Sequence, residues 1–158
     1  MRNLVRSAAL TAVAAVIVIG GTATAATAAV TPATTLETQV VAQTNVERVK
    51  AGCTALTVAP ALTEAARAHS TDMATFGYFS HTGRSGSTFT QRVAAAGYAK
   101  AVGENIAWGY ADAAGVMTGW MNSPGHRANI LTCKATTIGV GVARDAQGTL
   151  YWTQEFGA

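Results

Sequence analysis

The chain has 158 residues, 12% of them charged, and a formal net charge of +3. Two of its eleven basic residues, Arg2 and Arg6, lie near the N-terminus, which leaves nine basic residues against eight acidic ones in the rest of the chain. This balance lacks the basic face that nucleic-acid binding needs, and no Lys/Arg cluster suits the chain to an anionic membrane surface. We therefore expect no nucleic-acid partner.

Residues 1–28 have the pattern of a secretory signal peptide. Two arginines precede the nearly apolar stretch 8–20, and Ala-x-Ala cleavage sites follow at Ala25 and Ala28. An uncleaved membrane anchor is the alternative, but the apolar stretch is shorter than the ~20 residues that a membrane span needs. We predict that the domain is secreted, with no transmembrane segment after removal of the signal.

Residues 29–35 are predicted to form a short linker, and residues 36–158 a single domain of ordinary size. A first helix is expected over 36–50, where valines supply the apolar positions, and a second over 59–76. The second helix has i, i+3, i+4, i+7 spacing that predicts a buried stripe of Leu62, Ala65, Ala66, His69, Met73 and Phe76. On this stripe, His69 is best interpreted as a hydrogen-bonded core histidine. A supporting role beside a site is the alternative.

The middle of the chain has short elements separated by polar or Gly-rich segments. After a loop over 81–86, Ser87 is predicted to cap a short helix. Residues 103–109 alternate like a strand, Asp112 begins a helix, and Ser123-Pro124 begins another with proline in its first turn.

The C-terminal third predicts a β-hairpin. Residues 138–143 and 150–156 alternate in side-chain character around a turn at 145–148. One face of the first strand carries only Gly139, Gly141 and Ala143, so we expect a helix to approach its backbone closely. Helices on both sides of a few strands predict an α+β sandwich.

Cys53 and Cys133 are the two cysteines of the chain. In an exported protein two cysteines most simply form one disulfide, which here would close a loop of about 80 residues. Two free thiols, or one nucleophilic cysteine, remain the alternatives, although neither cysteine lies in a catalytic motif.

Three polar residues lie between apolar segments: His81, Glu104 and His126. Imidazoles can bind a divalent metal or transfer protons near neutral pH, and a neighbouring carboxylate can fix their tautomer. The spacing alone fits no strict metal motif, so three unrelated loop residues remain the alternative. The chain has no phosphate-binding loop, Rossmann fingerprint or G-x-S-x-G elbow, and two histidines would hold a metal weakly.

Together, the motifs over about 40–157 resemble the CAP superfamily of cysteine-rich secretory, antigen 5 and pathogenesis-related proteins, in a compact bacterial form. The order and spacing of the matching segments are more specific than any single one. They are Asn45-Val46-Glu47-Arg48, Ala68-His69-Ser70-Thr71-Asp72-Met73-Ala74, Phe79-Ser80-His81, Ala95-Ala96-Gly97-Tyr98, Gly103-Glu104-Asn105-Ile106-Ala107, Trp120-Met121-Asn122-Ser123-Pro124-Gly125-His126-Arg127-Ala128-Asn129-Ile130-Leu131, Ile138-Gly139-Val140-Gly141-Val142 and Tyr151-Trp152-Thr153-Gln154.

The resemblance implies a three-layer α-β-α sandwich with a shallow cleft that holds two histidines and two acids. His81 and His126 match the metal-binding histidines, and Glu104 matches the first acid, as a supporting residue. The second acid, expected after Trp120, has no counterpart, and Asn122 could hydrogen-bond in its place without ionising.

For function, the resemblance favours a secreted, monomeric binding module for a lipid or cell-envelope ligand. The cleft would hold a weakly bound divalent cation, zinc or magnesium, and no organic cofactor. The alternative is a metal-assisted hydrolase of protease or esterase type, in which Glu104 acts as the general base beside His81 and His126.

Overall fold

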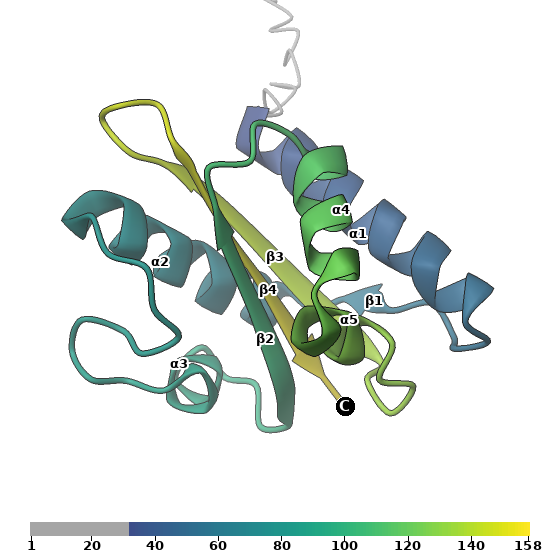
Figure 1. Ribbon diagram of the computed structural model, residues 1–158. Helices are drawn as coiled ribbons and strands as arrows, with labels where there is room; N and C mark the ends of the chain where they lie inside the picture. Colours follow the sequence, from purple (N-terminus) through teal and green to yellow (C-terminus); the bar gives the residue numbers. More distant parts are fainter. Residues whose placement is uncertain (1–31) are drawn as a thin grey trace, which may run out of the picture.

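The computed structural model describes residues 32–158, so the expected signal peptide and the first residues of the linker lie outside the described part. Its elements are α1 (Pro32–Lys50), β1 (Thr57–Val58), α2 (Pro60–Phe76), α3 (Phe89–Ala95), β2 (Ala101–Trp108), α4 (Ala113–Asn122), α5 (Pro124–Ile130), β3 (Thr137–Arg144) and β4 (Leu150–Gly157). The strands form a mixed sheet in the order β1-β3-β4-β2. Helices α2 and α3 cover one face, and α1, α4 and α5 the other, which confirms the three-layer sandwich (Figure 1).

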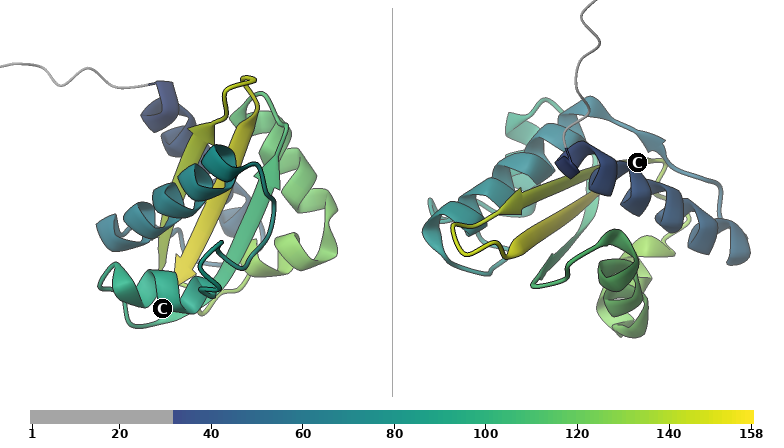
Figure 2. Two further views of the ribbon diagram at one scale, coloured as in Figure 1. Left: turned by 90° about the vertical axis from the view of Figure 1, so that its left-hand side faces the viewer. Right: turned by 90° about the horizontal axis from the view of Figure 1, so that it is seen from above.

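Helix α2 lies very close to the sheet because β3 presents glycines to it. A Cβ atom on Gly139 would overlap the carbonyl carbon of Leu62, and one on Gly141 would overlap the backbone nitrogen of Arg67. The expected close approach of a helix is therefore confirmed, and the side view shows α2 lying across the hairpin (Figure 2, left). The predicted hairpin is confirmed, because β3 and β4 pair antiparallel, with Arg144 opposite Leu150 beside the turn.

The main apolar core lies on the opposite face of the sheet, under α1, α4 and α5. Its largest fully buried apolar side chains include Trp120, Trp152 and Phe156. The buried face of α1 is unusual, because Glu37, Thr44 and Arg48 lie there beside Val40. Two of the expected apolar positions were wrong: Val46 and Val49 are 52% and 62% exposed.

Arg48 is a cation buried at the end of α1, and backbone carbonyls stabilise it there. Its guanidinium donates to the carbonyls of Thr54, Ile130, Thr132 and Ala135 at 2.8–3.1 Å. The bonds to Ile130, Thr132 and Ala135 tie α1 to the end of α5 and the segment that follows it. The disulfide between Cys53 and Cys133 joins the same two regions and confirms the predicted pairing.

Three local features differ from the expectation. Helix α1 begins at Pro32, so it takes in residues 32–35 of the expected linker, since proline suits the first turn of a helix. Thr88, not Ser87, caps α3, because Thr88 and Gln91 form a reciprocal capping box. Phe76, expected in the buried stripe of α2, is 54% exposed, while the other five members are buried.

The short strand β1, which pairs in parallel with β3, had no sequence signal. Within residues 32–158 no helix combines the length and the apolar character that crossing a bilayer requires.

Candidate functional site

Strand β2 lies at the edge of the sheet and holds one histidine segment on each of its faces. Adjacent residues of a strand point to opposite faces. Accordingly, the Glu104 carboxylate accepts a hydrogen bond from Nδ1 of His81 at 2.7 Å on the α2 side. The Asn105 side chain donates to the carbonyl of His126 at 3.1 Å on the α5 side. The two neighbouring residues thus bring His81 and His126 to the same edge of the sheet.

His81 lies in the loop between α2 and α3, with its side chain 55% exposed. Arg92 of α3 holds this loop by donating to the carbonyls of His81 and Ser87 at 3.0 and 2.9 Å. When Nδ1–H donates to Glu104, the lone pair of Nε2 is free for a metal or a substrate proton. This is the arrangement in which an outer carboxylate orients a metal-binding histidine.

Glu104 is a buried anion whose two oxygens are both engaged. One accepts from His81, and the other lies 2.5 Å from Nη2 of Arg92, whose side chain is 11% exposed. Burial alone would raise the pKa of Glu104, but the hydrogen bond from His81 and the charge of Arg92 outweigh burial and lower it. Glu104 is therefore a fixed, ionised acceptor at neutral pH.

His126 lies in the first turn of α5, which begins at Ser123-Pro124 as predicted. Burial lowers the pKa of His126, and repulsion from His81, when that ring is protonated, lowers it further. The imidazole of His126 is consequently neutral at neutral pH, which is the form that binds metal.

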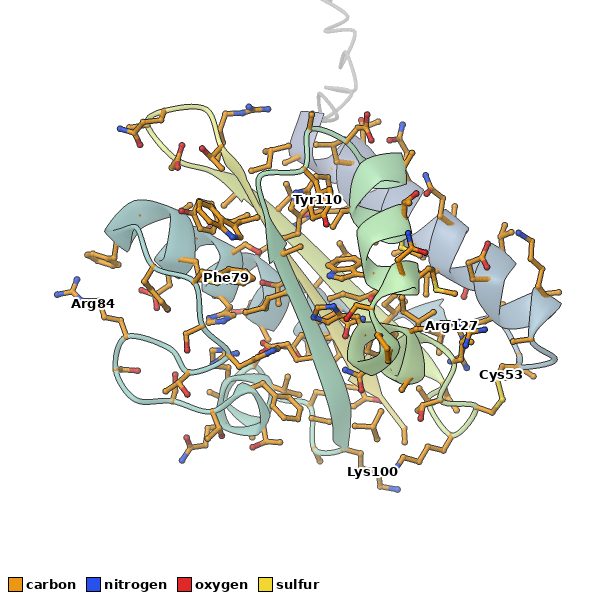
Figure 3. All side chains as sticks on the ribbon, viewed as in Figure 1. Cys53, Phe79, Arg84, Lys100, Tyr110 and Arg127 are labelled. Atoms are coloured by element: carbon orange, nitrogen blue, oxygen red, sulfur yellow. A yellow bond between two sulfur atoms is a disulfide. The ribbon has the colours of Figure 1, made fainter. Side chains whose placement is uncertain are left out.

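A pocket of about 290 Å³ lies beside His126 and has an aromatic wall. Phe79 and Trp108 line it, 45% and 55% exposed, and their ring centroids lie 6.1 Å apart. Figure 3 shows Phe79 on the α2 side of β2 and Tyr110 beside α4, so residues from both faces of the sheet contribute to this pocket. Aromatic side chains left exposed around a hollow are typical of a binding surface.

A cation at this edge of the sheet would find few protein donors. His81 and His126 supply two imidazole donors, and among residues 32–158 no group of three His, Cys, Asp or Glu side chains could hold a metal. Two protein ligands are fewer than the three of most catalytic zinc centres, so water or a bound ligand would complete the coordination.

The remaining predicted residues lie apart from this edge or beneath it. Asn122 is exposed at the end of α4 and lines a different pocket, of about 320 Å³, together with Gln43 of α1 and Met117. His69 is buried, with Nε2 2.9 Å from the carbonyl of Ser80, which confirms the hydrogen-bonded core histidine. Burial lowers the pKa of His69 and keeps the ring neutral.

One site residue was missed in the sequence: Glu155 of β4. It lies directly opposite Glu104 in the β2–β4 register and is 0% exposed. Burial, followed by the charge of Glu104, raises the pKa of Glu155 to about 10. The hairpin register could have indicated it, because Glu155 pairs with Gly139 on the face that the helix covers.

The family model "CAP: Cysteine-rich secretory protein family" matches residues 41–156. The chain is 41% identical over 121 residues to YkwD of Bacillus subtilis, covering 76% of this chain and 46% of that protein. It is 39% identical over 125 residues to YlbC of the same organism, described as a membrane protein, covering 78% of this chain and 34% of the relative. The chain thus spans less than half the length of these curated relatives.

Among solved structures, an extracellular SCP-domain protein of Bacillus anthracis superposes with a TM-score of 0.72 at 32% identity, over 79% of this chain and 41% of that one. An outer surface protein of Borrelia burgdorferi shares the fold, with a TM-score of 0.68 at 20% identity, over 75% of this chain and 88% of that one. The family match, the sequence identity and the fold agree: this chain belongs to the cysteine-rich secretory protein (CAP) family.

Proposed function

We propose that this domain acts outside the cell as a binding module for a lipid or cell-envelope ligand, with a divalent cation held between His81 and His126. The observation that carries the proposal is the buried Glu104, which fixes Nδ1 of His81 at 2.7 Å and leaves the other ring nitrogen for a ligand. The extracellular description of the Bacillus anthracis relative supports the location.

Zinc suits this cleft better than magnesium. Imidazole is a good ligand for zinc, whereas magnesium prefers oxygen ligands and retains its waters. The lowered pKa of His126 keeps one donor neutral at neutral pH. With two protein ligands the ion would be exchangeable, and its open positions could accept an oxygen atom of the bound ligand.

The aromatic pocket supports an amphiphilic ligand. Phe79, Trp108 and Tyr110 offer apolar surface, while Ser123 and His126 line the same pocket with polar groups. A ligand with an apolar body and an oxygen-bearing head would bury the body against the rings and place the head near His126.

A hydrolase that uses Glu104 as general base fits less well. A general base must lie within hydrogen-bond reach of the water that it activates. Both oxygens of Glu104 are held by His81 and Arg92, and the residue is 4% exposed. Glu104 is better placed to orient His81 than to take a proton from water.

Calorimetric titration with Zn²⁺ at pH 7.5 tests the cation site. We expect binding by the wild-type domain, and near loss of binding in His81→Ala and in His126→Ala. Asn122→Ala is the matched control, because Asn122 lines the other pocket, and its affinity should be unchanged. Equal binding by all four proteins would overturn the site.

Tryptophan fluorescence tests the ligand surface. Trp120 and Trp152 are 1% and 0% exposed, so a spectral shift on adding phosphatidylglycerol vesicles would report mainly on Trp108, which is 55% exposed. We expect a blue shift in the wild-type protein, enhanced by Zn²⁺ and absent in Trp108→Phe. No shift with or without Zn²⁺ would argue against a lipid ligand.

A further inference from the structure

We propose that Glu155 is a neutral carboxylic acid that donates its acid hydrogen to Glu104, and that it acts as a positioning residue for His81 through this bond. The positioning role rests on the proposed cation site. The carboxyl pair itself does not depend on any metal, so the two parts can be tested separately.

The described residues supply no hydrogen-bond donor to Glu155. Its side chain is fully buried between Glu104 on β2 and Gly139 on β3, and the glycine offers no side chain. No N–H or hydroxyl group within residues 32–158 donates to either carboxyl oxygen of Glu155. An ionised carboxylate buried without donors is very costly, so the group takes up a proton instead.

The charges around the two carboxyls also favour a neutral Glu155. Among the described groups that influence Glu155, Arg92 of α3 supplies the positive charge, and this guanidinium already lies 2.5 Å from Glu104. His69 of α2 faces the same cluster but stays neutral, because burial lowers its pKa. One cation balances one carboxylate, so the second carboxyl is neutral.

Of the two carboxyls, Glu155 is the one that carries the proton. Glu104 already accepts from His81 and Arg92, so the negative charge belongs there. The pKa values of the pair move in opposite directions: that of Glu104 is lowered, while burial and the charge of Glu104 raise that of Glu155 to about 10. From about pH 5 to pH 9 the pair holds one proton, which the two carboxyls share in one hydrogen bond.

Glu155 then matters for His81 because it completes the ring of donors around Glu104. Three donors, from His81, Arg92 and Glu155, hold the Glu104 carboxylate in place. A fixed and ionised Glu104 keeps the proton of His81 on Nδ1, which leaves Nε2 as the free donor atom.

The pH dependence of stability tests the protonation state. Between the ordinary glutamate pKa of 4.5 and about 10, the folded protein binds a proton at Glu155 that the unfolded chain lacks. Stability must therefore fall as pH rises through this window. Relative to Glu155→Gln, the unfolding equilibrium constant of the wild-type protein should rise about tenfold per pH unit between pH 6 and pH 8. A ratio that does not change with pH would overturn the proposal.

Infrared difference spectra provide a direct check that needs no unfolding. The wild-type protein at pH 8 should show a carboxylic acid band that Glu155→Gln lacks. A carboxylate band in its place would show that Glu155 is ionised and would also overturn the proposal.

The positioning role is tested by rescue. The amide side chain introduced by Glu155→Gln still offers an N–H donor to Glu104, whereas Glu155→Leu offers none. We expect Zn²⁺ affinity near the wild-type value in the first variant and a loss on the order of tenfold in the second, at the lower end of outer-shell effects. Nitrogen NMR of His81 should show the Nδ1–H tautomer in the wild-type protein and in Glu155→Gln, and a mixture in Glu155→Leu.

The outcomes separate the two proposals. A wild-type protein that binds no Zn²⁺ but keeps the pH slope and the acid band would sink the cation site and leave the carboxyl pair standing. The same His81 tautomer in the wild-type protein and in both Glu155 variants would refute the positioning role.

Discussion

Replacing Glu104 with glutamine should destabilise the fold as well as weaken the cleft. The substitution keeps the shape of the side chain but removes the negative charge between His81 and Arg92. The amide can accept a hydrogen bond through its oxygen, but its NH₂ group would face a donor. The Arg92 side chain, 11% exposed, loses the carboxylate with which it pairs.

The magnitude follows from the burial of this pair. Removing one partner of a buried ion pair costs about 3–5 kcal/mol. Arg92 keeps its bonds to the carbonyls of His81 and Ser87, which offset part of the loss, so we expect about 2–4 kcal/mol. At about 3–4 °C per kcal/mol for a domain of this size, the Tm should fall by roughly 6–16 °C.

Urea unfolding followed by circular dichroism at pH 7 measures this loss. Glu47→Gln is the matched control, because Glu47 pairs with Lys50 on the exposed side of α1 at 2.8 Å. An exposed pair of this kind contributes about 0–1 kcal/mol. If Glu104→Gln and Glu47→Gln lose the same small amount of stability, the buried ion pair is not the anchor described here.

Three other perturbations follow from the same structure. Cys53→Ser opens the disulfide loop and should lower the free energy of unfolding by up to about 4 kcal/mol, so the Tm under oxidising conditions should fall by several degrees. An unchanged Tm would contradict this. Gly141→Ala pushes a Cβ into the α2 backbone and should cost at least about 1–3 kcal/mol in urea unfolding, whereas Gly125→Ala, with open space around it, should cost little. Zn²⁺ affinity measured by calorimetry should fall steeply from about pH 7 to pH 5, with a slope that approaches two protons per bound ion. Because the pKa of His126 is lowered, protonation of His126 should weaken binding at the acidic end of this range. A one-proton slope would leave a single histidine as ligand.

The fold was predictable wherever periodicity or turn chemistry reports on packing. The stripe of α2 and the Gly face of β3 each indicated the partner that the structure shows. The register of α1 was not predictable in this way, because its buried face carries Arg48 and Thr44. Hydrogen bonds to distant segments of the chain satisfy these side chains, and the spacing of apolar residues along α1 does not report such bonds.

The site was predictable in part for a similar reason. Glu104 and His81 stood out by residue type, and the structure places them in contact. Glu155 did not stand out, because β4 lies between two strands and between the two helical layers. Both faces of β4 are therefore buried, and the alternation of side chains along it no longer separates a core face from a solvent face. The interaction of Glu155 with Glu104 depends on strand order, which joins segments about 50 residues apart.

Anomalous diffraction from crystals soaked in Zn²⁺ tests the central claim most directly. The account predicts a single zinc peak at the free edge of β2, bound by Nε2 of His81 and by the imidazole of His126, with Nδ1 of His81 still hydrogen-bonded to Glu104. Zinc bound elsewhere on the domain, or a His81 ring turned away from Glu104 to bind through Nδ1, would contradict it.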